Sequence, residues 1–220
     1  MRAYLALASI VAAASVAHAG LVDPAKLKTS PDGANANVQH QLDTLFPGVS
    51  VDTDQLASEL FQVCNPEIET TWTMQYQFAG QGPRAKLGYY TDLGSANPTV
   101  TWVIGGSSSG LPSSTSLFLP NTVFGLALAS GDAEDGGTVY YSQTAKNADG
   151  FNHMAALSLA PCTENNCDVL TTWEDLRNGG DQDYNDDSVR VQNIESVPEP
   201  ASMTILGLGA LAAFRKKKAR

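Results

Sequence analysis

The feature that most constrains the fold is an alternation of side chains with period two that begins after Ile68. Trp72, Met74, Tyr76 and Phe78 are apolar, and the residues between them are Thr or Gln. Such alternation is typical of a β-strand with one face buried and the other in water. We therefore expect a strand here.

Further strand-like runs follow along the chain. They lie at 85–91, 99–104, 123–129, 138–144, 153–159, 168–173 and 188–192. The segments between them are rich in Gly, Ser, Asn, Asp and Pro, which favour turns, and no helical pattern intervenes. Many short strands joined by turns predict a mainly β fold, either an antiparallel β-sandwich or a jelly-roll-like domain.

The segment ahead of these strands has a helical period instead. Apolar residues recur at helical spacing from Val38 to Phe46, where Pro47 breaks the run. Asp52 and Gln55 then resemble a capping box ahead of a second apolar run. We therefore expect one or two short N-terminal helices.

The amino end has the features of a secretion signal. Arg2 supplies a positive charge, residues 3–16 form an apolar run, and Ala17 and Ala19 give a small-x-small cleavage site. This order is typical of a signal peptide. We expect residues 1–19 to be removed during export.

The carboxyl end combines three elements in a fixed order. Pro198, Glu199 and Pro200 come first, an apolar segment at 203–214 follows, and Arg and Lys residues close the chain. The apolar segment is shorter than the roughly 20 residues that a membrane span needs. The basic cluster resists translocation, so we expect transient anchoring in the inner membrane.

This tail, residues 197–220, resembles the PEP-CTERM sorting signal, in which a Pro-Glu-Pro motif precedes a hydrophobic segment and a basic end. The resemblance implies processing by an exosortase-type enzyme in a Gram-negative bacterium that makes extracellular polysaccharide. It also implies export to the cell surface or to the extracellular matrix of a biofilm. Whether the mature protein is released or anchored stays open.

A single domain is expected between the two ends. We predict a flexible segment at 20–36 and one β-sandwich domain at 37–196, a length that can bury one core. The whole chain has a formal net charge of −10, and both removable ends carry basic residues. Nucleic acid is not an expected partner, because binding to phosphates needs a basic surface. Cations are the natural counter-charge.

The most informative segment is acidic. Asp181, Asp183, Asn185 and Asp187 stand at every second position, so a tight loop can point several oxygens at one centre. Calcium suits such ligands because it accepts roughly 6 to 8 oxygens in irregular geometry, whereas zinc prefers His or thiolate. We therefore expect a calcium site in this loop.

Other acidic residues could complete the site. Glu174 and Asp175 precede the loop, and a second acidic turn carries Asp132, Glu134 and Asp135. The spacing is not that of an EF-hand, since the required Gly and final Glu are missing. The alternative is that Asp and Asn act here only as turn formers that hydrogen-bond their own backbone.

The same segment is similar to the C-terminal signature of the domain-of-unknown-function family four-one-one-four. The signature spans 173–191, and the matching residues are Trp173, Glu174, Asp175, Leu176, Gly179, Gly180, Asp181, Asp183, Tyr184, Asn185 and Asp186, followed by Val189, Arg190 and Val191. The resemblance covers about 87–193. It implies a β-rich extracellular module that could depend on calcium, with no established catalysis.

Three cysteines are present. Cys162 and Cys167 are separated by a turn-like stretch, and an exported protein meets an oxidising compartment. We expect a local disulfide between them. Cys64 is left over and could instead pair with either of the two, which the sequence does not decide.

One motif has the spacing of a hydrolase. Ser108 stands between glycines as in a nucleophile elbow, and Asp132 or Asp135 and then His153 follow in hydrolase order. The elbow also requires a helix directly after the Ser, and the next residues are loop-like. A serine hydrolase is therefore a remote alternative.

Aromatic residues suggest a second alternative. Tyr89, Tyr90, Tyr140 and Tyr141 could stack on sugar rings if they are exposed, or could form contacts within the sheets. The main hypothesis is an exported, non-enzymatic surface or matrix protein stabilised by calcium. The alternative is a carbohydrate-binding module that acts on exopolysaccharide.

Overall fold

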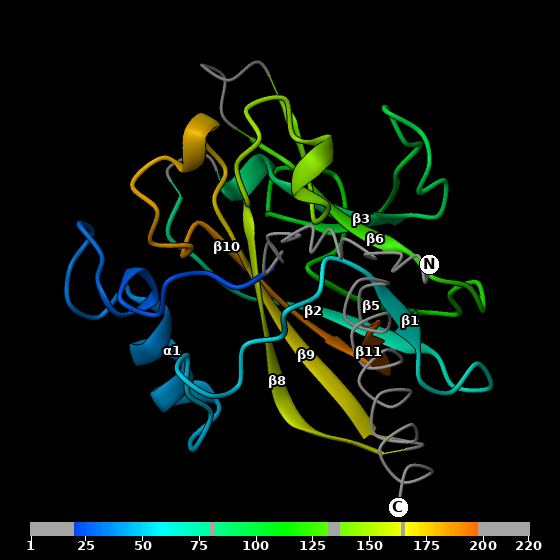
Figure 1. Cartoon of the computed structure of the whole chain (residues 1–220), viewed down its shortest axis with the longest axis horizontal. Coiled ribbons are helices and arrows are strands. Elements are labelled where there is room, and N and C mark those ends of the chain that lie inside the picture. Colours follow the sequence, from blue (N-terminus) through cyan, green and yellow to red (C-terminus); the bar gives the residue numbers. More distant parts are fainter. Residues whose placement is uncertain (1–19, 80–81, 132–136, 164–165, 198–220) are drawn as a thin grey trace, which may run out of the picture.

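Antiparallel sheets dominate the computed structural model, which describes residues 20–79, 82–131, 137–163 and 166–197 (Figure 1). The strands are β1 (Phe61–Val63), β2 (Thr70–Gln77), β3 (Lys86–Tyr90), β4 (Thr101–Gly105), β5 (Ser114–Leu117), β6 (Gly125–Ala129), β7 (Val139–Tyr141), β8 (Met154–Thr163), β9 (Asn166–Trp173), β10 (Asp187–Gln192) and β11 (Ile194–Ser196). The helical elements are α1 (Val38–Leu45) and the 3-10 turns η1 (Lys26–Lys28), η2 (Gly82–Arg84), η3 (Thr144–Lys146) and η4 (Arg177–Gly179). The predicted mainly β class is confirmed.

Two larger sheets face each other across the main core. The five-stranded sheet has the order β5-β2-β10-β9-β8, the four-stranded sheet has the order β4-β3-β6-β7, and β1 pairs with β11. The core residues include Trp72, Met154, Trp173, Val189 and Val191 from the first sheet and Leu87, Ile104, Leu126 and Leu128 from the second. Burial of this apolar surface, worth roughly 25 cal/mol per Å², holds the sandwich together.

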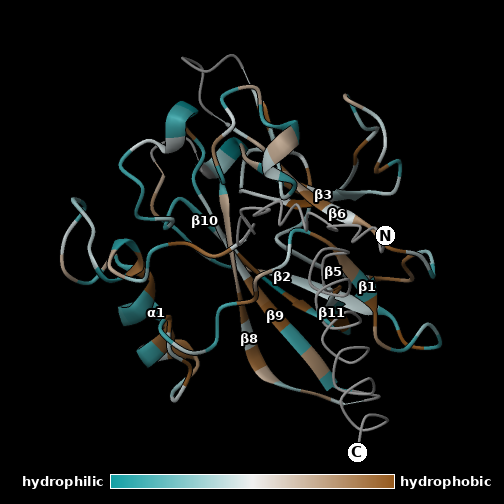
Figure 2. Cartoon of the chain, viewed as in Figure 1, coloured by the Kyte–Doolittle hydropathy of each residue, from teal (hydrophilic) through white to brown (hydrophobic). Residues whose placement is uncertain are grey.

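A second core lies on the other face of the five-stranded sheet. Ala155, Leu157 and Leu170 point away from the sandwich core and are covered by the N-terminal segment and α1. Figure 1 shows α1 on the side of β8 and β9 that is remote from β3 and β6. Apolar and polar bands alternate along β9 in Figure 2, and this strand is buried on both faces.

The first expected helix forms and the second does not. Asn37 caps α1, because its side-chain oxygen accepts a hydrogen bond from the backbone N–H of His40 at 2.9 Å. The segment after Asp52 is not helical. Gln55 instead bonds the backbone of Val22 and bridges to β8. Packing of this segment on β8 therefore outweighs its helical pattern.

The predicted strands correspond to β2, β3, β4, β6, β7, β8, β9 and β10, whereas β1, β5 and β11 were not anticipated. β5 shows why, since its sequence Ser-Thr-Ser-Leu has no clear apolar alternation. It pairs with β2 through hydroxyl groups, with Thr71 to Ser116 at 2.9 Å and Thr73 to Ser114 at 3.0 Å.

The predicted targeting segments, 1–19 and 198–220, lie outside the described residues. This applies to the cleavage residues Ala17 and Ala19 and to the sorting residues Pro198, Glu199 and Pro200. Within the described ranges, none of the helices has both the length and the apolar character needed to cross a membrane.

Candidate metal centre

The acidic loop connects β9 to β10 at one end of the five-stranded sheet. Trp173 and Asp187 are register partners where the two strands meet the loop. The backbone is left-handed at Asn178, Gln182 and Tyr184, with φ of 57°, 65° and 58°. Residues other than Gly adopt such conformations at a cost of roughly 1 kcal/mol or more each, and hydrogen bonds such as Gln182 N–H to the backbone oxygen of Gly179 at 2.7 Å help to hold this shape.

Buried oxygens without a hydrogen-bond partner gather in this part of the described chain. They include Glu174 Oε2, Asn185 Oδ1 and Asp187 Oδ2, which we call the inner oxygens, and all three residues are fully buried. The other carboxylate oxygens are used, since Glu174 Oε1 accepts from the Tyr184 N–H at 2.6 Å and Asp187 Oδ1 accepts from Gln77. A buried polar atom without a partner costs about 1–3 kcal/mol.

A second group of carboxylates lies at the surface of the loop. Asp32, Asp181 and Asp183, which we call the outer group, place one oxygen each within 4.8 Å of one another. Asp32 and Asp181 are exposed, whereas Asp183 is buried. Asp32 was not anticipated, because a single Asp in a turn carries no ligand pattern. It reaches the loop because the N-terminal segment covers β8 and β9.

Asn185 connects the loop to the N-terminal segment. Its side-chain NH₂ donates to Asp183 Oδ2 at 2.7 Å, to Ser30 Oγ at 2.9 Å and to the backbone oxygen of Ala36 at 3.2 Å. The amide nitrogen therefore binds the outer group and the N-terminal segment together. The amide oxygen is left as one of the inner oxygens.

The carboxyl groups of the loop hold their protons unusually tightly. Burial raises the pKa of Asp183 to about 6, and the charge of Asp181 adds to this effect. Burial also raises the pKa of Asp187 to about 7. The pKa values of Glu174 and Asp186 are raised by burial and by neighbouring carboxylates. A divalent cation would act in the opposite direction and favour the charged forms.

The structure does not gather all of the predicted ligands at one point. Among the acidic side chains described, Asp181 and Asp183 share the outer group with Asp32. Asp187 instead faces Gln77 on β2. Asp175 is buried, and its backbone N–H donates to Asp186 Oδ2 at 2.9 Å. The weaker predicted ligands, Asp132, Glu134 and Asp135, lie outside the described residues.

His153, just before β8, holds the acidic loop through hydrogen bonds. Its ring is fully buried and stacks on Tyr140 with a centroid distance of 3.7 Å. Nδ1 lies 2.9 Å from the backbone oxygen of Glu174, and Nε2 lies 3.0 Å from Asp149 Oδ2. The same Asp149 oxygen accepts from the Asn178 N–H at 2.8 Å. These contacts fix both the start of the loop and η4.

Ser108 does not have the geometry of a nucleophile elbow. It is exposed in a turn, and its N–H donates to the backbone oxygen of Pro83 at 2.6 Å. The chain continues through 109–113 into β5, so no helix follows within these described residues. The nitrogens of His153, the candidate base, are both occupied by the loop contacts described above.

A polar cleft of about 570 Å³ lies beside the loop. Its lining includes Asn97, Tyr141, Lys146, Arg177 and Asn178. η4 of the acidic loop thus forms part of one wall. Of the four tyrosines expected either to stack on sugar rings or to form contacts within the sheets, Tyr90 and Tyr140 are buried, whereas Tyr89 and Tyr141 are half-buried.

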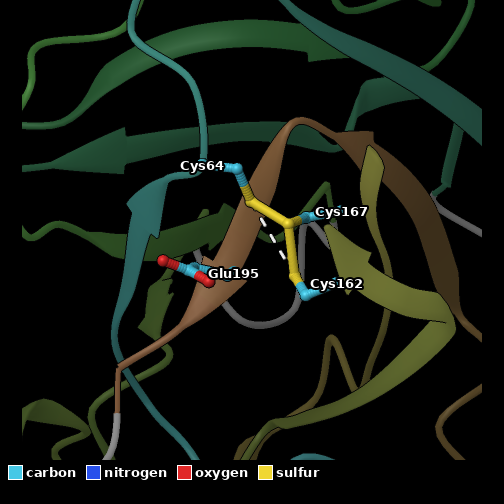
Figure 3. A group of neighbouring side chains, drawn as sticks. All are labelled: Cys64, Cys162, Cys167 and Glu195. Carbon is cyan, nitrogen blue, oxygen red and sulfur yellow. Dashed lines mark hydrogen bonds between the residues drawn. A yellow bond between two sulfur atoms is a disulfide. The ribbon is translucent and has the colours of Figure 1, made fainter. Parts of the chain in front are cut away.

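The three cysteines meet at the opposite end of β9 (Figure 3). Cys167 lies between the other two, with Cα–Cα distances of 4.4 Å to Cys162 and 6.5 Å to Cys64. Both pairs are close enough for a disulfide. Because one sulfur forms only one disulfide, the predicted Cys162–Cys167 bond is one of two alternatives at this site.

Two family models match the chain. Residues 116–193 match the Domain of unknown function (DUF4114), and residues 196–218 match the PEP-CTERM protein-sorting motif. The first match includes the whole acidic loop, and both resemblances inferred from the sequence are confirmed. No curated protein and no solved structure gives a significant match. The sorting motif marks an exported protein that is processed by an exosortase and associates with the cell envelope.

Proposed function

We propose that this exported protein is a non-enzymatic component of the cell surface or extracellular matrix, and that calcium bound at the acidic loop stabilises it. Two observations carry the proposal. Fully buried oxygens of Glu174, Asn185 and Asp187 in and beside the loop lack hydrogen-bond partners, and the loop carboxylates Asp181 and Asp183 cluster with Asp32 of the N-terminal segment. Turn formation alone would not leave such oxygens unsatisfied.

The chemistry of the donors favours calcium. The outer group offers carboxylates from two separate segments, Asp32 from the N-terminal segment and Asp181 with Asp183 from the loop. Calcium takes oxygen ligands in flexible geometry, whereas zinc prefers His or thiolate, which this group does not contain. Three carboxylates this close repel one another unless a cation neutralises them.

Calcium binding here would tie the N-terminal segment to the sandwich. Asp32 and Ser30 lie on that segment, and Asn185 already bonds it. A cation shared by both sides would stabilise the folded state by mass action, by roughly 2.7 kcal/mol at a concentration 100 times the Kd.

Calorimetric titration of the mature protein with calcium tests the proposal. We expect saturable binding, loss of binding in Asp183→Asn and weaker binding in Asp32→Asn. Asp52→Asn is the matched control, because Asp52 lies in an exposed ion pair with Lys28 near the same segment. Equal binding by all four proteins would contradict the assignment of the site, and no binding by any of them would contradict calcium.

A carbohydrate-binding module is the second candidate, favoured by the polar cleft beside η4. Tyr141 contributes an aromatic side chain to its lining, and Asn97, Lys146 and Asn178 contribute hydrogen-bonding groups. Retention on the polysaccharide of the producing organism tests it. Tyr141→Ala should abolish retention, and Phe118→Ala, at an exposed aromatic residue that does not line the cleft, should not. Failure of the wild-type protein to bind would remove this candidate.

A further inference from the structure

We propose that Cys64, Cys162 and Cys167 form a disulfide-exchange site, in which Cys167 is the shared partner of two alternative bonds. The Sγ atoms of Cys64 and Cys162 lie 3.8 Å apart, and Cys167 Sγ lies between them (Figure 3). All three sulfurs and a carboxylate oxygen of Glu195 fall within 4.8 Å of one another. Whichever bond forms, one thiol is left beside it.

The two outer cysteines differ in exposure. Cys162 is exposed near the end of β8, Cys64 is half-buried after β1, and Cys167 is 2% exposed at the start of β9. Reagents and solvent therefore reach Cys162 most easily, whereas the shared sulfur is protected. A protected centre with an accessible thiol beside it favours exchange within the site over attack from outside.

The exchange step needs no oxidant. Starting from the Cys64–Cys167 disulfide, Cys162 loses its proton to water, and the thiolate attacks Cys167 Sγ. The Cys162–Cys167 bond forms as the Cys64–Cys167 bond breaks. The electron pair leaves on Cys64, which takes a proton from water. The numbers of disulfides and thiols are unchanged.

Exchange would alter how the β1–β11 sheet is attached. Cys64 follows β1, and its N–H donates to the backbone oxygen of Asn193, whose own N–H donates to the backbone oxygen of Cys167 at 2.6 Å. The Cys64–Cys167 bond spans 103 residues and crosslinks this junction, whereas the Cys162–Cys167 bond spans only 5. Only the first bond ties β1 covalently to the five-stranded sheet. β11 leads directly into the sorting motif.

Alkylation of the mature protein, purified without reductant, tests the exchange. Rapid labelling with excess iodoacetamide should give two singly labelled species, one with the label on Cys162 and one with the label on Cys64. Slow labelling with limiting reagent should shift the ratio toward labelled Cys162, because exchange replenishes the more exposed thiol. Mass spectrometry of peptides then identifies the labelled cysteine in both experiments. The peptides are prepared in acid, because protonated thiols do not exchange.

Several outcomes would overturn the proposal. Label on a single cysteine in both regimes would mean one fixed disulfide, and an unchanged ratio would mean a static mixture. Label on all three cysteines would mean that no internal bond forms. A disulfide-linked dimer would mean that the third thiol pairs between chains instead of exchanging within the site.

Single variants separate this inference from the proposed function. Cys162→Ser should leave only the Cys64–Cys167 bond and keep amide exchange in β1 and β11 slow. Cys64→Ser should leave only the Cys162–Cys167 bond and make amide exchange in β1 and β11 faster. Equal amide exchange in both would contradict the claimed tether. Calcium binding should be the same in both variants, because the acidic loop lies at the other end of β9.

Discussion

The two ends of β9 hold distant segments to the same sheet by different chemistry. At the Trp173 end, carboxylates and amides of the acidic loop contact the N-terminal segment. At the Cys167 end, sulfur joins the sheet to the end of β1. Under the two proposals above, the first attachment would respond to cations and protons, and the second would respond to redox state. Each end of this one strand would then be secured under a different condition outside the cell.

The largest expected effect is at the sulfur end. Cys167→Ser removes both alternative disulfides, and alkylation of both Cys64 and Cys162 checks that these two, whose Sγ atoms lie 3.8 Å apart, do not pair instead. With both thiols free, the free energy of unfolding in denaturant without reductant should fall by about 2–5 kcal/mol. Cys162→Ser leaves the longer-range bond and should lose much less. Equal losses in the two variants would contradict the role of Cys167 as the shared disulfide partner.

The next effect is a pH dependence confined to the loop end. The pKa of Asp187 is about 7 in the folded protein, against an ordinary value of 3.8. The folded state therefore binds this proton more tightly than the unfolded state. The stability that Asp187 contributes is fully present below its ordinary pKa of 3.8. It is lost as the pH rises through its pKa of about 7 in the folded protein. Without calcium, unfolding between about pH 5 and pH 8 should lose about 2–4 kcal/mol.

Asp187→Asn should reduce the slope of this profile, and the part that remains should come from Asp183 and Asp186, whose pKa values are also raised. Asp52→Asn should leave the profile unchanged. Added calcium should also flatten it, since a cation stabilises the charged carboxylates. If the calcium-free protein instead became more stable from pH 5 to pH 8, the raised pKa of Asp187 would be contradicted.

A smaller effect is expected from removing one charge of the outer group without changing its packing. Asp183→Asn keeps the shape of the side chain and removes a charge, so the stabilisation by calcium should fall by about 1–3 kcal/mol. Stability in chelator should change little, because the variant also relieves repulsion from Asp181. Thermal unfolding with and without calcium measures both values, and full retention of the calcium effect would exclude Asp183 as a ligand.

The smallest effects come from single hydrogen bonds at the two ends. Ser30→Ala removes an acceptor of Asn185, and Gln62→Ala removes the donor to Glu195 beside the cysteines. Each should cost about 0.5–1.5 kcal/mol. Only Ser30→Ala should weaken calcium binding. The same response to calcium in both variants would show that the N-terminal segment is not part of the site.

Local pattern was enough to predict most of the sandwich. The strands with apolar alternation, such as β2, and the long buried strands β8 and β9 were anticipated because their pattern reflects burial. β5 was missed because an edge strand paired through hydroxyl groups needs no apolar face. The prediction of one or two N-terminal helices is met by α1 alone, since Gln55, the residue of the suspected capping box, bonds the distant backbone of Val22 instead of a helix end.

The candidate site was only partly predictable, because its parts come from distant segments. The alternation of acids identified Asp181 and Asp183, which do lie together. Asp32 has no such signal, and its role follows only from the packing of Leu27 and Val38 against the five-stranded sheet. The same limit applies to Cys64, whose approach to Cys167 depends on the pairing of β1 with β11.

Thermal unfolding of the mature protein at neutral pH, in calcium and in chelator, tests whether calcium stabilises the fold through the acidic loop. We expect a higher midpoint in calcium, together with slower amide exchange in residues 20–36. A midpoint and an exchange pattern that are the same in both conditions would contradict a calcium centre in the acidic loop.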